Sequence, residues 1–282
     1  MAGSGPGPVL PRGLGLPTDR MLVMGILNVT PDSFSDGGRW ADPEAALAHA
    51  AQMAADGADI IDVGGESTRP HSRRLTGEEE WARIGGVVEG LAARGLVVSV
   101  DTIHAETARR AADSGAALIN DVSGGRADRA MNAAVAATGC AYVIQHWRQF
   151  PGSADEDFDY RDDTVGTLME ETSRQVGEAL DAGIARERIV VDPGLGFSLT
   201  AAQSWEVVDA LGRLRDLGYP VLIGASRKRF LADACGGDRD AATLAVSRRA
   251  RDAGMWAVRV HDVAPNARLA RIGTETAGRD GS

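Results

Sequence analysis

The 282-residue sequence predicts an α/β protein that folds as a (β/α)₈ barrel of the TIM type. Eight short runs are apolar on both faces, and each of them ends in a cluster of polar residues. Ala-rich segments with helical spacing lie between the runs, so each strand is followed by a helix. Strands of this kind, alternating with helices, form a parallel sheet covered by helices, and eight such units close naturally into a barrel. An open doubly wound sheet is the alternative fold.

The strands and helices are expected in regular alternation along the chain. The eight expected strands lie at 22–27, 58–63, 96–100, 117–119, 141–144, 189–191, 220–223 and 255–258. Six expected helices between them lie at 43–56, 78–94, 104–114, 162–182, 203–217 and 240–253. The polar clusters begin directly after the strands, at 28, 64, 101, 120, 145, 192, 224 and 259. Because such barrels carry their active sites at the carboxyl ends of the strands, these clusters are expected to form one catalytic mouth.

One domain accounts for the length, since about 250 residues is typical of this barrel. We expect the barrel to span 19–275, after a disordered Gly/Pro-rich leader at 1–18 and before a disordered tail at 276–282. The two cysteines, Cys140 and Cys235, do not make a disulfide framework and suit a reducing cytoplasm. A formal charge of -10 argues against a nucleic-acid surface, and no run is long enough for a transmembrane helix.

The segment 24–38, with the sequence MGILNVTPDSFSDGG, is the most informative stretch of the chain. An apolar strand stops abruptly at Asn28 and continues into a loop whose polar side chains a structural turn would not require. The segment closely resembles the amino-terminal signature of the dihydropteroate synthases, a folate-pathway family that joins a pterin diphosphate to 4-aminobenzoate. The resemblance extends over 22–267 and implies the same barrel and the same activity.

A pterin pocket deep in the barrel is implied by this resemblance, at Asp101, Asn120, Asp192 and Lys228. Each residue has suitable chemistry, because Asp192 can accept from the amino and ring N–H groups of a pterin, and Lys228 can donate to its carbonyl. Phe197, in the turn after the sixth strand, is also expected to contact substrate.

The resemblance also implies an anion site for the diphosphate, formed by Asn28, Thr68, Arg259 and His261, with Mg²⁺ near Asn28. Arg259 and His261 stand two apart, so strand alternation is expected to turn both toward one phosphate group. No protein nucleophile is required for the reaction.

Loops after the first two strands are expected to close over the substrates. By resemblance, Asp36 would stabilise the pterin cation, while Phe34 and Pro70 would frame the aminobenzoate ring. Arg69 would lie nearby, and Ser67 would help to shape the closed loop. The expected catalytic residues are Asp36, Arg69, Lys228 and Arg259.

Three departures from the family pattern stand near the expected mouth or the late helices. Gln145 replaces a common Met before His146, and Leu199 replaces a common Lys. His146 itself is equally compatible with a place at the edge of the site and with a structural role. Family members commonly form homodimers through the late helices, where this chain carries Arg248, Arg249 and Arg251. Such arginines are typical of a solvated face and weaken the expectation of that dimer.

Two other functions fit parts of the pattern. One is a diverged paralogue that binds pterins without making dihydropteroate, which the intact strand-one loop and the Glu-Ser-Thr-Arg-Pro segment disfavour. The other is the pterin-binding barrel of a folate-dependent methyltransferase. Such a barrel has no reason to retain the Thr-Pro-Asp-Ser-Phe-Ser loop together with the Arg-x-His pair.

Overall fold

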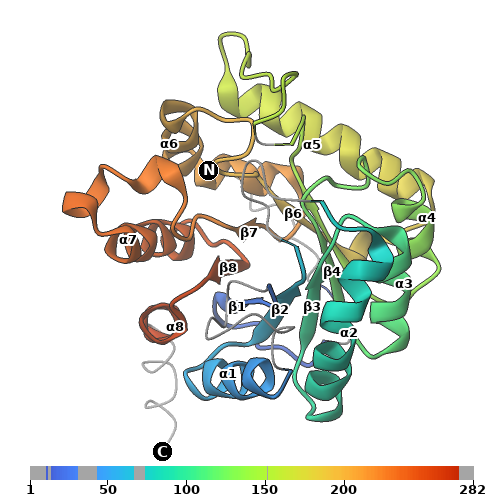
Figure 1. Cartoon of the computed structure of the whole chain (residues 1–282). Helices are drawn as coiled ribbons and strands as arrows, with labels where there is room; N and C mark the ends of the chain where they lie inside the picture. The colour runs from blue at the N-terminus through green and yellow to red at the C-terminus, as the bar shows by residue number, and fades with distance from the viewer. Residues whose placement is uncertain (1–10, 12–13, 31–42, 67–73, 151, 273–282) are drawn as a thin grey trace, which may run out of the picture.

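The computed structural model describes residues 11, 14–30, 43–66, 74–150 and 152–272, which form a parallel barrel surrounded by helices (Figure 1). The strands are β1 (Leu22–Asn28), β2 (Ile60–Gly64), β3 (Val98–Asp101), β4 (Leu118–Asp121), β5 (Ala141–Gln145), β6 (Ile189–Asp192), β7 (Leu222–Ile223) and β8 (Ala257–Val260). Their order is β6-β5-β4-β3-β2-β1-β8-β7. A parallel bridge between Val191 and Val221 brings the two edges together, so the predicted barrel is confirmed and the open sheet is excluded.

Helices follow the strands around the outside of the barrel. They are α1 (Pro43–Ala55), α2 (Gly77–Ala93), α3 (Ala105–Asp113), α4 (Met131–Ala136), α5 (Thr164–Asp181), α6 (Ala201–Asp209), α7 (Arg239–Asp252) and α8 (Val263–Arg271). Four 3₁₀ helices complete the described elements: η1 (Arg186–Arg188), η2 (Leu211–Leu217), η3 (Arg229–Leu231) and η4 (Ala234–Gly237).

The starts of α2, α5 and α6 are fixed by local side-chain hydrogen bonds. Thr76 and Glu79 form a capping box at the start of α2, and Thr200 and Gln203 form another at the start of α6. The carboxylate of Asp163 caps α5 by accepting a hydrogen bond from the backbone N–H of Gly166. These contacts orient the helices against the strands that they follow.

The helical pattern of the sequence differs from the structure in three places. The expected helix at 203–217 is divided into α6 and η2, and Gly212, a poor helix former, lies just after the division. Helix α4 has 6 residues, too few to display a helical period. Helix α8 contains Pro265, which is tolerated because the first turn of a helix needs no internal N–H donors.

Two apolar layers result from the alternation of side chains along the strands. Val23 and Leu27 belong to the large outer cluster between strands and helices, whereas Leu22 and Met24 belong to a smaller cluster inside the barrel. Trp256 closes the inner cluster at the amino-terminal ends of the strands. The interior is therefore filled with apolar side chains at that end and becomes polar toward the carboxyl ends.

The segment just before β1 packs against this apolar floor. Leu14 and Leu16, which fall in the expected leader, contact the inner cluster. Arg20 makes two hydrogen bonds to the carboxylate of Asp59, at 2.8 and 2.6 Å, and so attaches the segment to the start of β2.

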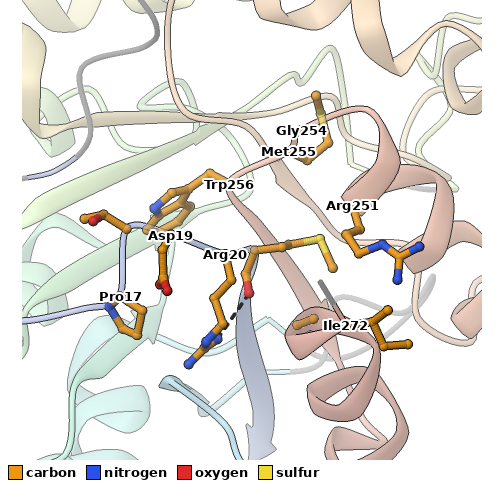
Figure 2. Close-up of a pocket in the computed structure, with 11 residues that line it drawn as sticks. Pro17, Asp19, Arg20, Arg251, Gly254, Met255, Trp256 and Ile272 are labelled. Atoms are coloured by element: carbon orange, nitrogen blue, oxygen red, sulfur yellow. Dashed lines mark hydrogen bonds between the residues drawn. The ribbon is translucent and has the colours of Figure 1, made fainter. Parts of the chain in front are cut away.

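A cavity of about 380 Å³ lies at the amino-terminal end of the barrel (Figure 2). Its lining includes Asp19 and Arg20 before β1, Trp256 before β8, and Ile272 after α8. These residues lie at the end opposite to the predicted mouth, so the cavity does not belong to the site described next.

Candidate active site at the carboxyl ends of the strands

The inward-facing positions at the carboxyl ends of six neighbouring strands are polar, except for a glycine on β2. Along each strand, every second residue counted from a member of the inner apolar cluster faces the interior. The last such positions on β1 to β6 are Asn28, Gly64, Asp101, Asn120, Gln145 and Asp192. Strand β8 adds Arg259, and the connection after β7 adds Lys228. The polar clusters thus converge as the sequence predicts.

Arg259 occupies the centre of this polar layer between two carboxylates. Its Nε donates to Oδ2 of Asp62 at 2.6 Å, and its Nη2 donates to Oδ2 of Asp101 at 2.7 Å. Burial would lower the pKa of Arg259, but the two carboxylates outweigh it and raise that pKa. Burial also raises the pKa of Asp101 to about 7, despite the opposing charge of Arg259. Arg259 is therefore a permanent cation beside a carboxyl group that titrates near neutral pH.

Asp62 is a site residue that the sequence interpretation missed. Its side chain is fully buried, and its Oδ2 also accepts a hydrogen bond from Nδ2 of Asn120 at 3.1 Å. A signal was present in the sequence, because a carboxylate inside an apolar strand is costly to bury without partners. Asp62 is in phase with Gly64, so its side chain faces the same interior as Asp101 and Asn120.

Asp192 and Lys228 form the second charged group of the site. Oδ1 of Asp192 accepts the backbone N–H of Gly194 at 2.7 Å, and burial raises the pKa of this carboxyl despite the nearby positive charge of Lys228. Lys228, the single lysine of the chain, donates to the backbone oxygen of Leu195 at 2.5 Å. Its Nζ lies 4.4 Å from the centre of the Phe197 ring. Burial lowers the pKa of Lys228 to about 8, against the attraction of Asp192.

Glycine makes room for this group where β7 ends. A Cβ on Gly224 would lie 3.2 Å from Oδ2 of Asp192 and 3.9 Å from Nζ of Lys228. A larger residue at this position would therefore crowd the carboxylate of Asp192 and approach the amine of Lys228.

His261 lies just beyond β8 and contacts the connection that carries Lys228. Its Nδ1 lies 2.9 Å from Oγ of Ser226, and its backbone N–H donates to the same hydroxyl at 3.1 Å. The Arg-x-His pair therefore has separate partners here, because Arg259 contacts Asp62 and Asp101 while His261 contacts Ser226.

The two departures after strands five and six have different surroundings. Gln145 is buried at the mouth and donates to the backbone oxygen of Val122 at 3.3 Å. Leu199 is buried and packs into the outer apolar cluster between strands and helices. His146 faces away from the interior, and its Nε2 lies 2.8 Å from Glu171 of α5, which supports its structural role.

Six of the predicted site residues lie outside the described residues: Phe34, Asp36, Ser67, Thr68, Arg69 and Pro70. The described positions on either side of 67–73 are joined by Glu66. Its carboxylate accepts from Nη1 of Arg74 at 2.6 Å and from the backbone N–H of Leu75 at 3.1 Å. Burial would raise the pKa of Glu66, but hydrogen bonds from His104, Arg74 and Leu75 lower it overall.

Comparison with known proteins identifies the family. Residues 24–261 match the profile of the pterin binding enzymes. The dihydropteroate synthase of Mycobacterium leprae is 47% identical over 253 residues, which cover 86% of this chain and 88% of that protein. The dihydropteroate synthase of Streptococcus pyogenes serotype M1 is 41% identical, with 86% and 91% covered. The chain belongs to the dihydropteroate synthase family.

Solved structures of dihydropteroate synthases agree with this assignment. The Xanthomonas albilineans dihydropteroate synthase with 4-aminobenzoic acid has a TM-score of 0.84 and 39% identity, and the match covers 92% of this chain and 94% of that one. The same enzyme in complex with 7,8-dihydropteroate has a TM-score of 0.82 and 36% identity, with 93% and 96% covered. The resemblance in the strand-one segment is thus confirmed over most of the chain. Within the described residues, no helix is long and apolar enough to cross a membrane.

Proposed function

We infer that the chain condenses 6-hydroxymethyl-7,8-dihydropterin diphosphate with 4-aminobenzoate to give 7,8-dihydropteroate and diphosphate. The observation that carries this function is the convergence of Asp101, Asn120, Asp192, Lys228 and Arg259 at one end of the barrel. Relatives support the same function. The Mycobacterium leprae relative is a dihydropteroate synthase, and the Xanthomonas albilineans enzyme has been solved with 4-aminobenzoic acid and with 7,8-dihydropteroate, the amine substrate and the product of the proposed reaction.

We propose that the pterin ring lies between the two charged groups. Asp192 accepts from the ring N–H and exocyclic amino group, while Lys228 donates to the ring carbonyl. Asn120 and Asp101 contact the opposite edge of the ring. This assignment is supported by the burial of Asp192 and Asn120, because a planar ligand with paired donors and acceptors would satisfy groups that water reaches poorly.

The diphosphate is proposed to bind above this ring, against Asn28, Thr68, Arg259 and His261. Charge-assisted hydrogen bonds from a guanidinium are well suited to phosphate oxygens. Arg259 would exchange its contact with Asp101 for a contact with the diphosphate, since both acceptors are anionic.

Mg²⁺ is proposed to bind beside Asn28. The residues fit such an ion, because Asn28 Oδ1 and Asp101 Oδ2 lie on the same side of Gly64, within 3.9 Å of the point where a Cβ would stand. Among the described residues, no group of three or more acidic, His or Cys side chains could hold a metal alone. Mg²⁺ is commonly held by one or two protein oxygens together with substrate phosphates and water. When bound, the ion would neutralise charge on the diphosphate.

The proposed reaction needs no protein nucleophile. The reaction has a dissociative character: the bond from the pterin methylene carbon to the diphosphate breaks first, and the amine nitrogen of 4-aminobenzoate then bonds to the resulting pterin cation. Diphosphate leaves with the bonding electrons, and the amine loses a proton. Arg259 stabilises the departing anion and Lys228 holds the ring, so the protein contributes orientation and electrostatics.

Residues outside the described part complete this proposal. Asp36 stabilises the pterin cation, Phe34 and Pro70 frame the aminobenzoate ring, and Ser67 and Arg69 shape the loop around it. Phe197, beneath Lys228, is proposed to contact the pterin.

A cytoplasmic location and a homodimer are also proposed. Both Cys140 and Cys235 are free thiols, as expected in a reducing compartment. On α7, Arg249 pairs with Asp209 of the neighbouring α6, so at least one of the late-helix arginines is neutralised within the chain. This pairing reduces the charge that a dimer through these helices would have to bury.

The function is tested by incubating purified protein with the pterin diphosphate, 4-aminobenzoate and Mg²⁺. Dihydropteroate and free diphosphate are expected in equal amounts. Binding of the pterin diphosphate without product would instead identify a pterin-binding paralogue. Methyl transfer from a methylated folate, without condensation, would identify the methyltransferase alternative.

A further inference from the structure

Asp62 lies one step deeper in the barrel than the residues predicted to read the substrate. Its neighbours across the sheet are Ile26 on β1 and Ser99 on β3, whereas Asp101 pairs with Gly64 above it. The side chain of Asp62 has no exposed surface. A carboxylate at this depth is costly unless polar partners compensate for the water that it has lost.

A single oxygen of Asp62 holds two residues that come from different strands. Oδ2 accepts from Nε of Arg259 at 2.6 Å and from Nδ2 of Asn120 at 3.1 Å. Oδ1 is buried and has no hydrogen-bond partner in the described part of the chain. Asp62 thus joins Arg259, the proposed contact of the diphosphate, to Asn120, the proposed contact of the pterin.

The contact with Nε fixes how Arg259 can move. Nε is the nitrogen nearest the aliphatic stem, so Asp62 holds the base of the guanidinium while Nη2 reaches Asp101. The outer nitrogens can then exchange Asp101 for another anion while the base of the guanidinium stays attached. Arg259 is held ready in this way, with little side-chain entropy left to lose on binding.

The contact with Asn120 fixes the direction of an amide. Oδ2 of Asp62 accepts the hydrogen bond, so the amide of Asn120 lies with Nδ2 toward Asp62. The carbonyl oxygen of Asn120 is thereby turned away from Asp62 and becomes the acceptor offered to a ring N–H.

We propose that Asp62 is a positioning residue that couples recognition of the pterin to recognition of the diphosphate, through the oxygen shared by Arg259 and Asn120. The proposal rests on the proposed function, because it uses the substrate assigned there. Asp62 itself does not touch either reacting group.

The variant Asp62→Asn tests this coupling because it keeps the shape and removes the charge. Calorimetry with the pterin diphosphate is expected to show a tenfold or greater loss of affinity, in a range that one charged hydrogen bond accounts for. The matched control is Ser99→Ala, which alters the buried polar residue paired with Asp62 on β3, whose hydroxyl makes no hydrogen bond within the described part of the chain. This control is expected to bind within about twofold of the parent, because removing an unpartnered hydroxyl breaks no hydrogen bond in the site.

A double-mutant cycle separates positioning from general support of the fold. If Asp62 acts through Arg259, then Arg259→Ala should cost far less affinity for the pterin diphosphate in the Asp62→Asn background than in the parent. If the affinity loss of the double variant equalled the product of the two single-variant losses, the proposal would be overturned. Equal affinity of Asp62→Asn and the parent for the pterin diphosphate would also overturn it. The cycle measures binding constants and does not depend on turnover. If the chain failed to make dihydropteroate, the proposed function would be contradicted, but the cycle could still be measured and would still test the coupling.

A second variant keeps the proposal testable if Asp62→Asn does not fold. Arg259→Lys retains a cation but lacks the Nε donor that contacts Asp62. We expect it to lose at least tenfold in affinity for the pterin diphosphate. Parent-like binding by Arg259→Lys would show that anchoring at Nε is unimportant and would overturn the proposal.

Discussion

The polar layer of this barrel depends on individual charges that are each held by another residue. Arg259 is shared between two carboxylates, and Lys228 lies above an aromatic ring with Asp192 nearby. In a buried site, removing one partner leaves the other without compensation, which is costlier than the net value of the contact. Substitutions here should therefore affect ligand binding strongly.

Asp192→Asn and Lys228→Ala are each expected to weaken pterin binding by about tenfold to a hundredfold, since each removes a partner worth roughly 1 to 3 kcal/mol inside a desolvated pocket. Calorimetry with the pterin diphosphate measures the loss. Asp209→Asn and Arg213→Ala are matched controls, because both residues are exposed on the outside of the barrel. Tight binding by either pocket variant would contradict the pocket assignment.

Arg259→Ala is expected to distinguish a pterin that carries diphosphate from one that does not. Loss of its charge-assisted hydrogen bonds should lower affinity for the diphosphate substrate on the order of tenfold to a hundredfold. Affinity for bare 6-hydroxymethyl-7,8-dihydropterin should change much less. Equal losses for the two ligands would mean that Arg259 supports the whole pocket, and the phosphate assignment should then be withdrawn.

The same substitution should also destabilise the fold. It leaves Asp62 and Asp101 without their shared cation, and breaking a buried pair costs about 3 to 5 kcal/mol. Urea unfolding measures this cost. Adding Asp62→Asn to Arg259→Ala should restore part of the stability, because one of the two unpaired charges is then absent.

At the scale of elements, one carboxylate just after β2 is attached to the residues just before α2. Glu66 binds Arg74 and the backbone of Leu75, while Arg74 also lies 4.0 Å above the ring of Phe150 in the connection after β5. The residues that flank 67–73 are thus held together by contacts that the structure describes.

Glu66→Gln is expected to raise KM for 4-aminobenzoate several-fold while leaving affinity for the pterin diphosphate close to that of the parent. The reason is that a neutral amide holds Arg74 more weakly, and the proposed aminobenzoate contacts follow directly after Glu66 in the sequence. Steady-state kinetics with each substrate varied in turn provides the measurement. Glu106→Gln on α3 is the control, since its ion pairs with Arg109 and Arg110 are exposed. A rise in both KM values would instead indicate general damage to the mouth.

Several elements could be predicted from sequence because their signals are local. Each strand is apolar on both faces, and Asp163, Thr76 and Thr200 mark helix starts with side-chain caps. Helix α4 and the division at η2 escaped prediction, because a helix of 6 residues is too short to show a period and a single glycine does not reveal where a helix becomes 3₁₀. Propensity is a weak guide to such boundaries.

At the scale of the whole molecule, closure of the barrel brings together residues that no spacing rule connects. Arg259 binds Asp101 across 158 residues and Asp62 across 197. The strand ends were predictable, and so was their meeting at one face, but which carboxylate would hold which cation was not. Asp62 was not predicted because it lies inside β2. The polar clusters mark only the points where strands end, and Asp62 comes two residues before that point.

Closure also makes stability depend on pH. Burial raises the pKa of Asp101 from its usual value of about 4 to about 7, so the folded state holds a proton that the unfolded chain releases. Its contribution to stability is therefore fully present below about pH 4 and is lost as pH rises through 7. Asp101→Asn cannot titrate, so its stability relative to the parent should increase with pH between these values. Urea unfolding at a series of pH values tests this, and a constant difference would show that Asp101 titrates normally.

Because Lys228 is the only lysine in the sequence, it can be labelled selectively. Apart from its amino terminus, this chain offers acylating reagents only one primary amine, and that amine lies where the pterin is proposed to bind. With its pKa lowered to about 8, a large fraction of Lys228 is uncharged and nucleophilic in mildly alkaline buffer. Mass spectrometry after brief acylation would then count occupied pockets directly, since a bound pterin shields the lysine while the amino terminus continues to react and serves as the internal standard.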